Sequence, residues 1–470
     1  MNRYIALFLS MFIILCLFSC KGTEQPVETF PNTDIYGNTL PPSDTIPDNI
    51  EGPHFELSRN GNNVVVIMLD RAMGPYIPFI FKEKPELYEK FAGFTYYKNT
   101  MSFSGKTNLA VPALLGGYEY TPVEMNKRDQ EPLVDKHNEA LLMMPVLFDK
   151  AGYEVTVCDP TYANYCWYPD LSLFDKYPGI DAYKTKGYFG PEDVSLTQTY
   201  YDTAHATGAS SYFLEPYNVM INMDEMTYVT NEVKNTYLFI SNDMTHEPIL
   251  LQTPDYLPAE NVDNEVYDAE HVDRFTVDGV TLNIETFNQM AHYHANVSAM
   301  LRIGEWLDYL REKQVYDNTK IIIVSDHGGM NLHGFDDLWL DEPTGANIDD
   351  LRSIEMYCPL LMVKEIGSVD FTVSEEFMTN ADVPTLATAG LIIRPKNPFT
   401  GKDINSSEKY AHDQFICISR DWNVNENNGK TFKGAYWATV RNNIWNADNW
   451  TLYPGWGVLK EHKAPLKNFN

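Results

Sequence analysis

Residues 64–70 read Val64-Val65-Val66-Ile67-Met68-Leu69-Asp70, an unbroken apolar run that ends in a carboxylate. A run of this length, rich in β-branched residues, is typical of a strand buried on both faces of a parallel sheet. Similar runs occur at residues 153–158, 237–240 and 321–324, and helical patterns at residues 137–150 and 285–313 lie between them. Strands that alternate with helices predict an α/β fold, a doubly wound and mostly parallel sheet flanked by helices.

Polar side chains follow three of these runs. The first ends at Asp70, the third leads into Ser241-Asn242-Asp243-Met244-Thr245-His246, and the fourth leads into Ser325-Asp326-His327-Gly328-Gly329. Ligands of open α/β sheets bind beyond the carboxyl ends of the strands, so we expect these groups at one edge of the sheet. A carboxylate beside an imidazole suits zinc or manganese better than calcium. Asp70, Asp326 and His327 therefore predict a site for a divalent ion.

A candidate nucleophile precedes a short apolar segment. Ser104-Gly105-Lys106-Thr107-Asn108 is followed by an apolar stretch to Leu115, which predicts a short helix with Thr107 at or near its N-terminus. Free backbone N–H groups and the helix dipole favour anions there. A cation can lower the pKa of a hydroxyl so that it attacks as a nucleophile, whereas the alternative is a threonine that only caps the helix. A nucleotide-binding loop is excluded, because position 100, where that motif requires glycine, is threonine.

The N-terminus carries an export signal. Arg3 precedes an almost wholly apolar run at residues 4–18, which Ser19-Cys20 closes. The run is too short for a membrane span of about 20 residues and fits a secretory signal whose end resembles a bacterial lipobox. We expect residues 1–20 to be a lipoprotein-type signal peptide with Cys20 as the lipidation site; an uncleaved anchor is the alternative. Either way, we expect an exported protein anchored to a bacterial membrane, with its catalytic domain outside the cytoplasm.

The rest of the chain divides into three parts. Residues 21–60 are rich in Pro, Thr, Asn, Asp and Glu without an apolar period, so they predict a disordered tether. Residues 61–395 carry the α/β pattern and predict the catalytic domain. Residues 396–470 contain strand-like segments at 415–419 and 435–440 and predict a small C-terminal antiparallel subdomain.

Charge and cysteine content narrow the possible partners. A formal net charge of −30 argues against nucleic acid as a partner, because both would be negative. The cysteines after the signal form no CxxC pair, which disfavours a zinc–thiolate site. Cys158 and Cys166 are near enough in sequence to form a disulfide in an oxidising compartment, and two free thiols are the alternative.

These motifs together resemble the sulfatase-like branch of the alkaline phosphatase superfamily, and within it the lipoteichoic acid synthase-like phosphoglycerol transferases. The resemblance runs from about Asn63 to Arg394. It includes the strand that ends at Asp70, the Ser-Gly-Lys-Thr segment, the Asp-His-Gly segment, and Asn380-Ala381-Asp382-Val383-Pro384-Thr385-Leu386, which resembles a structural helix of the family.

The resemblance implies that Asp70, Thr107, Asp326 and His327 ligate one divalent ion, with Mn²⁺ favoured over Zn²⁺ or Mg²⁺. Two ions, with Asp243 and His246 among the further ligands, are the alternative. It also implies that His246 lies near the phosphate, and we expect His333 as a second phosphate contact and Lys106 as a further positive charge.

The expected activity is transfer or hydrolysis of a phosphodiester through a phosphothreonine at Thr107, on a phospholipid head group or an envelope glycan; phosphoglycerol and phosphoethanolamine are the expected head groups. No nucleotide is expected. Sulfuric ester hydrolysis is an alternative, which the lack of a C/S-x-P-x-R motif disfavours. The other alternative is a non-catalytic binding lipoprotein with a degenerate site.

Overall fold

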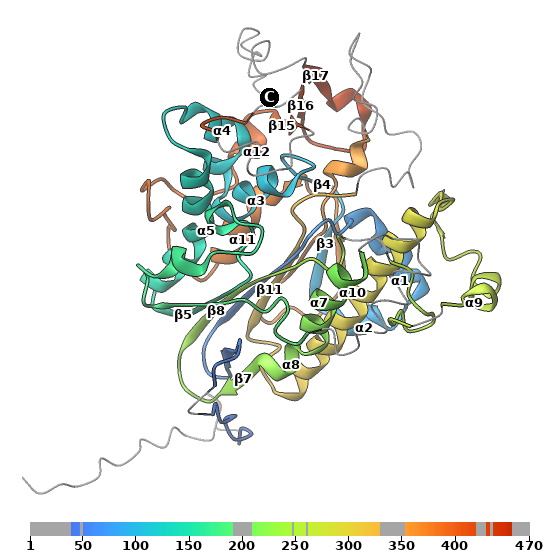
Figure 1. Cartoon of the computed structure of the whole chain (residues 1–470), viewed down its shortest axis with the longest axis horizontal. Coiled ribbons are helices and arrows are strands. Elements are labelled where there is room, and N and C mark those ends of the chain that lie inside the picture. The colour runs from blue at the N-terminus through green and yellow to red at the C-terminus, as the bar shows by residue number, and fades with distance from the viewer. Residues whose placement is uncertain are drawn as a thin grey trace, which may run out of the picture.

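The computed structural model of the chain describes residues 39–47, 50–190, 209–246, 249–259, 262–329, 353–419, 429–432 and 436–453. Cys20 and His333 therefore lie outside the described residues. An eight-stranded sheet forms the centre of the molecule (Figure 1). Its strands, in spatial order, are β13 (Thr372–Ser374), β3 (Phe94–Tyr97), β12 (Leu361–Lys364), β11 (Thr319–Val324), β2 (Asn63–Leu69), β8 (Asn235–Asn242), β5 (Tyr153–Cys158) and β6 (Ile180–Tyr183).

The sheet is parallel except at one strand. β12 runs antiparallel to both of its neighbours, β11 and β3, and the other pairs are parallel. The prediction of a doubly wound, mostly parallel α/β sheet is therefore confirmed. Each of the four apolar runs in the sequence is a strand, and all seven residues of β2 are buried.

Helices cover both faces of the sheet, which explains why β2 is apolar throughout. Alternate residues of β2, Val64, Val66 and Met68, share a hydrophobic cluster with α3 and α5, whereas Val65, Ile67 and Leu69 share another with α1, α7 and α10. In Figure 1 the two groups of helices lie on opposite sides of the sheet. On the first side are α3 (Thr107–Gly116), α4 (Pro122–Lys127), α5 (Leu133–Lys150) and α11 (Val383–Thr388); on the second are α1 (Ile77–Glu83), α2 (Leu87–Lys90), α7 (Ala209–Ile221), α8 (Met223–Met226) and α10 (Phe287–Glu312).

Smaller elements surround this core. The short sheets are formed by β1 (Phe55–Ser58) with β7 (Thr227–Thr230), β4 (Thr100–Met101) with β14 (Met378–Thr379), and β9 (Thr276–Val277) with β10 (Val280–Thr281). Two short helices are α9 (Glu265–Glu270) and α12 (Glu408–Ala411). The C-terminal region forms an antiparallel sheet of β15 (Gln414–Ile418), β16 (Tyr436–Val440) and β17 (Thr451–Tyr453), which agrees with the strands expected there.

The end of the expected tether is part of the folded body. Phe55 and Leu57 are buried in β1, which pairs with β7, and Asp44 accepts a hydrogen bond from the backbone N–H of Val229 at 2.9 Å. The prediction of disorder up to residue 60 is wrong for this part. The sequence did not indicate this ordered part, because its apolar residues are few and its hydrogen-bond partners lie far away in the sequence.

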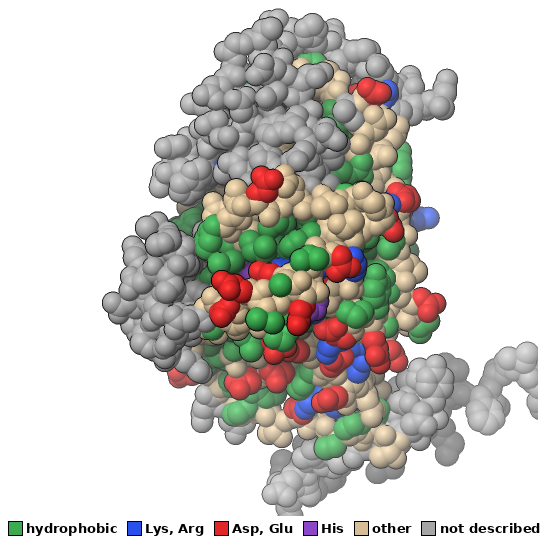
Figure 2. Space-filling model, turned by 90° about the vertical axis from the view of Figure 1, so that its right-hand side faces the viewer, with side chains coloured by type: hydrophobic (Ala, Val, Ile, Leu, Met, Phe, Trp, Pro, Cys, Tyr) green, Lys and Arg blue, Asp and Glu red, His purple; other side chains and the backbone are tan. Residues whose placement is uncertain are grey.

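The structure also bears on the expected disulfide and on membrane-spanning helices. Cys158 and Cys166 are free thiols, the first buried in β5 and the second exposed, so no disulfide joins them. Within the described part of the chain, no helix has the length and apolar character needed to cross a membrane. Acidic side chains are spread over the face in Figure 2 and exceed the basic ones in number, in keeping with the net charge of −30.

Candidate active site

The register of the sheet brings the predicted carboxylates together. β2 and β11 are parallel neighbours in which Met68 is opposite Val324, so the chain leaves the two strands at the same level. Asp70 and Asp326 are both two residues beyond that pair. Ligand atoms of Asp70, Asp326 and His327 lie within 4.8 Å of one another. The structure thus assembles three of the predicted metal ligands in one buried cluster.

The turn after β11 needs a glycine. A Cβ atom added at Gly328 would lie 2.0 Å from the carbonyl oxygen of Glu355, a backbone atom that cannot move aside. In the same turn, the backbone N–H of His327 donates to Asp326 Oδ1 at 2.8 Å. Asn380, at the start of the helix that the resemblance marks as structural, donates to the carbonyl oxygen of Asp326 at 2.9 Å.

The imidazole of His327 has a defined orientation. Its Nδ1–H donates to the carbonyl oxygen of Gly328 at 2.7 Å, which leaves Nε2 as the unprotonated nitrogen. Nε2 is 3.5 Å from Asp326 Oδ2 and 4.0 Å from Asp70 Oδ1. Burial lowers the pKa of His327 to about 4, so the ring is neutral at neutral pH and Nε2 can donate its lone pair to a metal.

Thr107 completes the cluster. It is the first residue of α3, as the sequence predicted, and its Oγ1 is 3.4 Å from His327 Nε2. No side-chain hydrogen bond caps this helix, so the hydroxyl has no capping role. Thr107 is 9% exposed, which leaves it shielded but within reach of the surface.

The residues of the cluster fit a divalent cation. Asp70 Oδ1 and Asp326 Oδ2 are buried and have no hydrogen-bond partner. Burial, followed by the negative charge of Asp326, raises the pKa of Asp70 well above its usual value. Two carboxylates this close, each with one buried oxygen that accepts no hydrogen bond, are costly unless a cation neutralises them. With one imidazole and one hydroxyl, they form a mixed oxygen and nitrogen set that suits Mn²⁺, Zn²⁺ or Mg²⁺.

The other predicted residues lie around the cluster. His246 follows β8 and is partly exposed, and its charge contributes to lowering the pKa of His327, which puts it near the cluster but outside the three-residue group. Lys106 directly precedes α3, and its carbonyl oxygen accepts from the N–H groups of Leu109 and Ala110, both at 3.0 Å. Asp243 forms an ion pair with Lys186 instead of joining the metal group.

Sequence reasoning missed several residues of the site. Arg71 has a left-handed backbone with φ of 65°, and this turn aims its N–H at Asp326 Oδ1, 3.1 Å away, while its guanidinium donates to the carbonyl oxygen of His246 at 3.1 Å. Asn108 is 1% exposed, and neither polar atom of its amide has a partner. A basic residue directly after a strand-end carboxylate, and a polar residue directly after the candidate nucleophile, were the signals that could have identified both.

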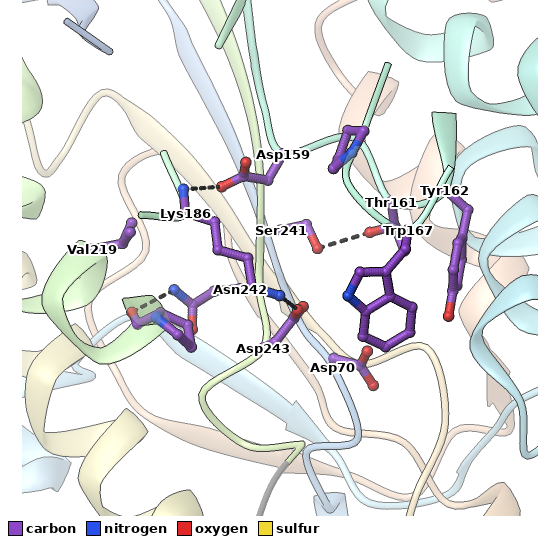
Figure 3. Close-up of a pocket in the computed structure, with 12 residues that line it drawn as sticks. Asp70, Asp159, Thr161, Tyr162, Trp167, Lys186, Val219, Ser241, Asn242 and Asp243 are labelled. Carbon is purple, nitrogen blue, oxygen red and sulfur yellow. Dashed lines mark hydrogen bonds and ion pairs between the residues drawn. The ribbon is translucent and has the colours of Figure 1, made fainter. Parts of the chain in front are cut away.

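A cleft opens beside the cluster. It holds about 550 Å³ of space open to solvent, and Figure 3 shows Tyr162 and Trp167 on one side, Lys186 and Asp243 on the other, and Asp70 at its end. Tyr162 and Trp167 come from the segment after β5, and Lys186 from the segment after β6. All of these elements end at the same edge of the sheet, as the sequence predicted for the site.

Comparison with known proteins shows the family to which the chain belongs. The family model described as sulfatase matches residues 62–342, more than half of the chain, and confirms the sulfatase-like resemblance. No curated protein is a significant match. Among solved structures, the lipoteichoic acid synthase LtaP from Listeria monocytogenes is 14% identical, covers 76% of this chain and 78% of that chain, and has a TM-score of 0.43.

Two other solved structures match over most of their length. The phosphonate monoester hydrolase SpPMH from Silicibacter pomeroyi is 13% identical, with 86% of this chain and 93% of that chain covered and a TM-score of 0.42. The putative sulfatase yidJ from Bacteroides fragilis is 14% identical, with 87% and 90% covered and a TM-score of 0.43. Identities this low say nothing about the substrate.

Proposed function

Since the chain belongs to the sulfatase family, we propose that it is an enzyme that transfers or hydrolyses a phosphate ester at Thr107. The observation that supports this most directly is the contact of Thr107 Oγ1 with His327 Nε2 at 3.4 Å, inside the cluster of Asp70, Asp326 and His327. A hydroxyl in this position is next to the residues that would hold a divalent ion, and at a helix N-terminus that favours anions.

Asp70, Asp326, His327 and Thr107 would hold one ion, with Mn²⁺ as the proposed metal. When bound, it would lower the pKa of the Thr107 hydroxyl and offset the negative charge of the phosphate group. The raised pKa of Asp70 has the direction expected for a carboxyl group that requires a cation to ionise in the folded protein.

The proposed reaction has two displacement steps at phosphorus. Thr107 Oγ gives up its proton and attacks, an Oγ–P bond forms, and the bond from phosphorus to the leaving alcohol oxygen breaks; that oxygen takes up a proton. Water or a second hydroxyl then gives up its proton and attacks the phosphothreonine, the Oγ–P bond breaks, and Thr107 Oγ takes up a proton. His246 would hold a non-bridging oxygen or supply the proton of the leaving alcohol, because it lies beside the cluster. Lys106 and His333 are proposed as further contacts of the phosphate.

The proposed substrate is a phospholipid head group, phosphoglycerol or phosphoethanolamine, or a phosphate-bearing envelope glycan. The proposed place is the outer side of a bacterial membrane, with Cys20 lipidated. Sulfuric ester hydrolysis remains the second candidate because the matching family model is that of sulfatases. The chain has threonine and no C/S-x-P-x-R motif at the nucleophile, which favours phosphate over sulfate.

Mass spectrometry tests the proposal. The Mn²⁺-loaded protein would be incubated with phosphatidylglycerol or phosphatidylethanolamine, quenched in acid and digested, and the peptide that contains Thr107 examined. We expect a phosphoglycerol or phosphoethanolamine adduct on Thr107, and no adduct in Thr107→Ala. An adduct on another residue, or turnover of a nitrophenyl phosphodiester by Thr107→Ala at the wild-type rate, would show that Thr107 is not the nucleophile.

A further inference from the structure

Tyr162 lies in the cleft beside the metal cluster and has no role in the mechanism above. It lines the cleft together with Asp70 and Asp243. Its hydroxyl has no hydrogen-bond partner among the described residues, although its ring is partly buried. Burial raises the pKa of Tyr162, and the negative charges of Asp70, Asp243 and Asp326 raise it further, so the hydroxyl keeps its proton at neutral pH.

The backbone that carries Tyr162 is strained. Residues Asp159, Tyr162, Asn164 and Tyr165 have φ angles of 51°, 58°, 54° and 55°. Non-glycine residues rarely adopt this left-handed conformation, and bulky ones are outliers there. Four such residues within seven positions require support from the surrounding structure, and strain of this kind is concentrated at functional sites.

Neighbouring elements supply this support. The backbone N–H of Asn164 donates to Asn138 Oδ1 at 2.9 Å, and Asn138 Nδ2 donates back to Asn164 Oδ1 at 2.8 Å, so that α5 holds the loop at two points. The fully buried His137 donates from Nε2 to the carbonyl oxygen of Thr161 at 3.0 Å. The Thr161 hydroxyl is 2.8 Å from that of Ser241 in β8. The residue directly before Tyr162 is thus fixed both to a helix and to a central strand.

The ring of Tyr162 is also held in place. It meets the indole of Trp167 edge to face, with ring centroids 5.9 Å apart, and packs against the hydrophobic cluster below α5. In Figure 3 the ring of Tyr162 lies at the wall of the cleft, and its hydroxyl is at the end of the ring nearer to Asp70. A fixed ring therefore presents an O–H donor to the cleft.

A phosphate group bound in this cleft would need hydrogen-bond donors. Asp70, Asp159 and Asp243 line it and are hydrogen-bond acceptors that repel an anion. Lys186 also lines it, but its ammonium group is paired with Asp243. A phosphate ester presents only oxygen acceptors, so a neutral O–H group is a favourable partner that adds no negative charge.

We propose that Tyr162 is a substrate-binding residue whose hydroxyl donates a hydrogen bond to an oxygen of the phosphate group. This inference rests on the proposed function at Thr107 and adds a residue that neither the sequence motifs nor the metal cluster identify. The strained, doubly anchored loop positions the hydroxyl before the substrate arrives, so little ordering is needed on binding.

The test compares Tyr162→Phe with Tyr165→Phe. Tyr165 is a matched control, because it lies in the same loop with the same backbone conformation and its buried hydroxyl also lacks a partner. Its ring packs on His137 instead of facing the cleft, with centroids 5.2 Å apart, and burial alone raises its pKa. Both substitutions remove one oxygen atom and keep the ring.

The readouts are the dissociation constant of inorganic phosphate for the Mn²⁺-loaded full-length protein, by calorimetry, and kcat/KM for a nitrophenyl phosphodiester. A hydrogen bond to a charged group predicts that Tyr162→Phe weakens both by roughly 10- to 100-fold, whereas Tyr165→Phe changes neither by more than about 2-fold. Metal content and melting temperature should match the wild type in both variants.

Phosphate binding that is equal in the wild type and Tyr162→Phe, or not measurable in the wild type, would overturn the inference. Equal losses in the two variants would also overturn it, because they would show a general effect of the loop. If Thr107→Ala keeps full turnover while Tyr162→Phe still binds phosphate weakly, the covalent mechanism is wrong and the role of Tyr162 stands.

Discussion

Asp70→Asn should make the metal-free protein more stable while abolishing its response to metal. The substitution keeps the shape of the side chain and removes one of two buried negative charges whose ligand atoms lie within 4.8 Å. Two unit charges at that separation, with an effective dielectric constant of about 20, repel by about 3.5 kcal/mol. Since Asp70 escapes part of this repulsion by protonation, we treat about 3 kcal/mol as the upper limit of the gain.

The gain in stability of metal-free Asp70→Asn over the wild type should increase with pH. The pKa of Asp70 in the folded, metal-free protein is raised above its value in the unfolded chain, so the folded state holds the proton more tightly. The contribution of Asp70 to the stability of the wild type is therefore greatest below the unfolded pKa of about 4 and is lost as pH rises through the folded pKa. Asp70→Asn lacks this loss, so the two proteins should differ little at pH 4 and most at pH 8.

Metal should reverse the order of stability. Free metal at about 1,000 times its dissociation constant stabilises the wild type by about 4.1 kcal/mol, more than the upper limit of the gain from the substitution, whereas the variant should gain far less. Urea unfolding at pH 4 and pH 8, with EDTA or with MnCl₂, measures all of these differences. Asp382→Asn is the control: that buried carboxylate accepts from Thr379 and Tyr118 and is 3.2 Å from the Lys409 ammonium group.

Loss of those satisfied contacts should make Asp382→Asn less stable with or without metal, while its response to MnCl₂ remains. The electrostatic reasoning would be refuted if metal-free Asp70→Asn were no more stable than the wild type at pH 8. The assignment of Asp70 as a ligand would be refuted if the variant gained as much stability from MnCl₂ as the wild type does.

Three further outcomes are expected. Thr107→Ala should abolish turnover with a melting temperature near that of the wild type, because Thr107 makes no capping hydrogen bond, and Thr107→Ser should keep a fraction of the activity; wild-type turnover in Thr107→Ala would contradict the covalent mechanism. His246→Ala should lower the rate by roughly 10²- to 10⁴-fold in the phosphodiester assay while bound metal, measured by elemental analysis, stays constant; loss of metal would make His246 a ligand. Cys20→Ala should release the protein from membranes or block its maturation, whereas unchanged membrane fractionation and electrophoretic mobility would favour an uncleaved anchor.

The sequence was sufficient for the parts of the fold that depend on local pattern. β5 begins and ends where its apolar run does, and Thr107 begins α3. By contrast, α5 begins at Leu133, four residues before the expected start. The first turn of this helix includes Lys136, a charged residue that the sequence pattern did not assign to a buried helix. That lysine is buried and donates to the carbonyl oxygens of Met125, Arg128 and Lys430. A charged residue satisfied by distant backbone groups looks like a solvent-exposed one in the sequence.

The candidate site also contains residues that the sequence could predict and residues that it could not. Asp70, Asp326 and His327 could be predicted because each follows a strand whose direction is fixed by the α/β pattern. Tyr162 could not, because its position depends on a left-handed backbone conformation, which the sequence does not signal for non-glycine residues. The side chains that the strands carry were thus predictable, whereas those on strained loops required the structure.

The C-terminal sheet contacts the segment that leads to the candidate nucleophile. Cys417 of β15 pairs with Ser104: the backbone N–H of Cys417 donates to the carbonyl oxygen of Phe103 at 2.9 Å, and Ser104 Oγ donates to the carbonyl oxygen of Cys417 at 2.9 Å. Phe103 also shares a hydrophobic cluster with Ile416 and Ile418. These contacts fix the segment that ends three residues later at Thr107, and α3 continues from it without a capping side chain. The position of the candidate nucleophile therefore depends on a strand more than 300 residues further along the chain, so the C-terminal region and the α/β body are one functional unit.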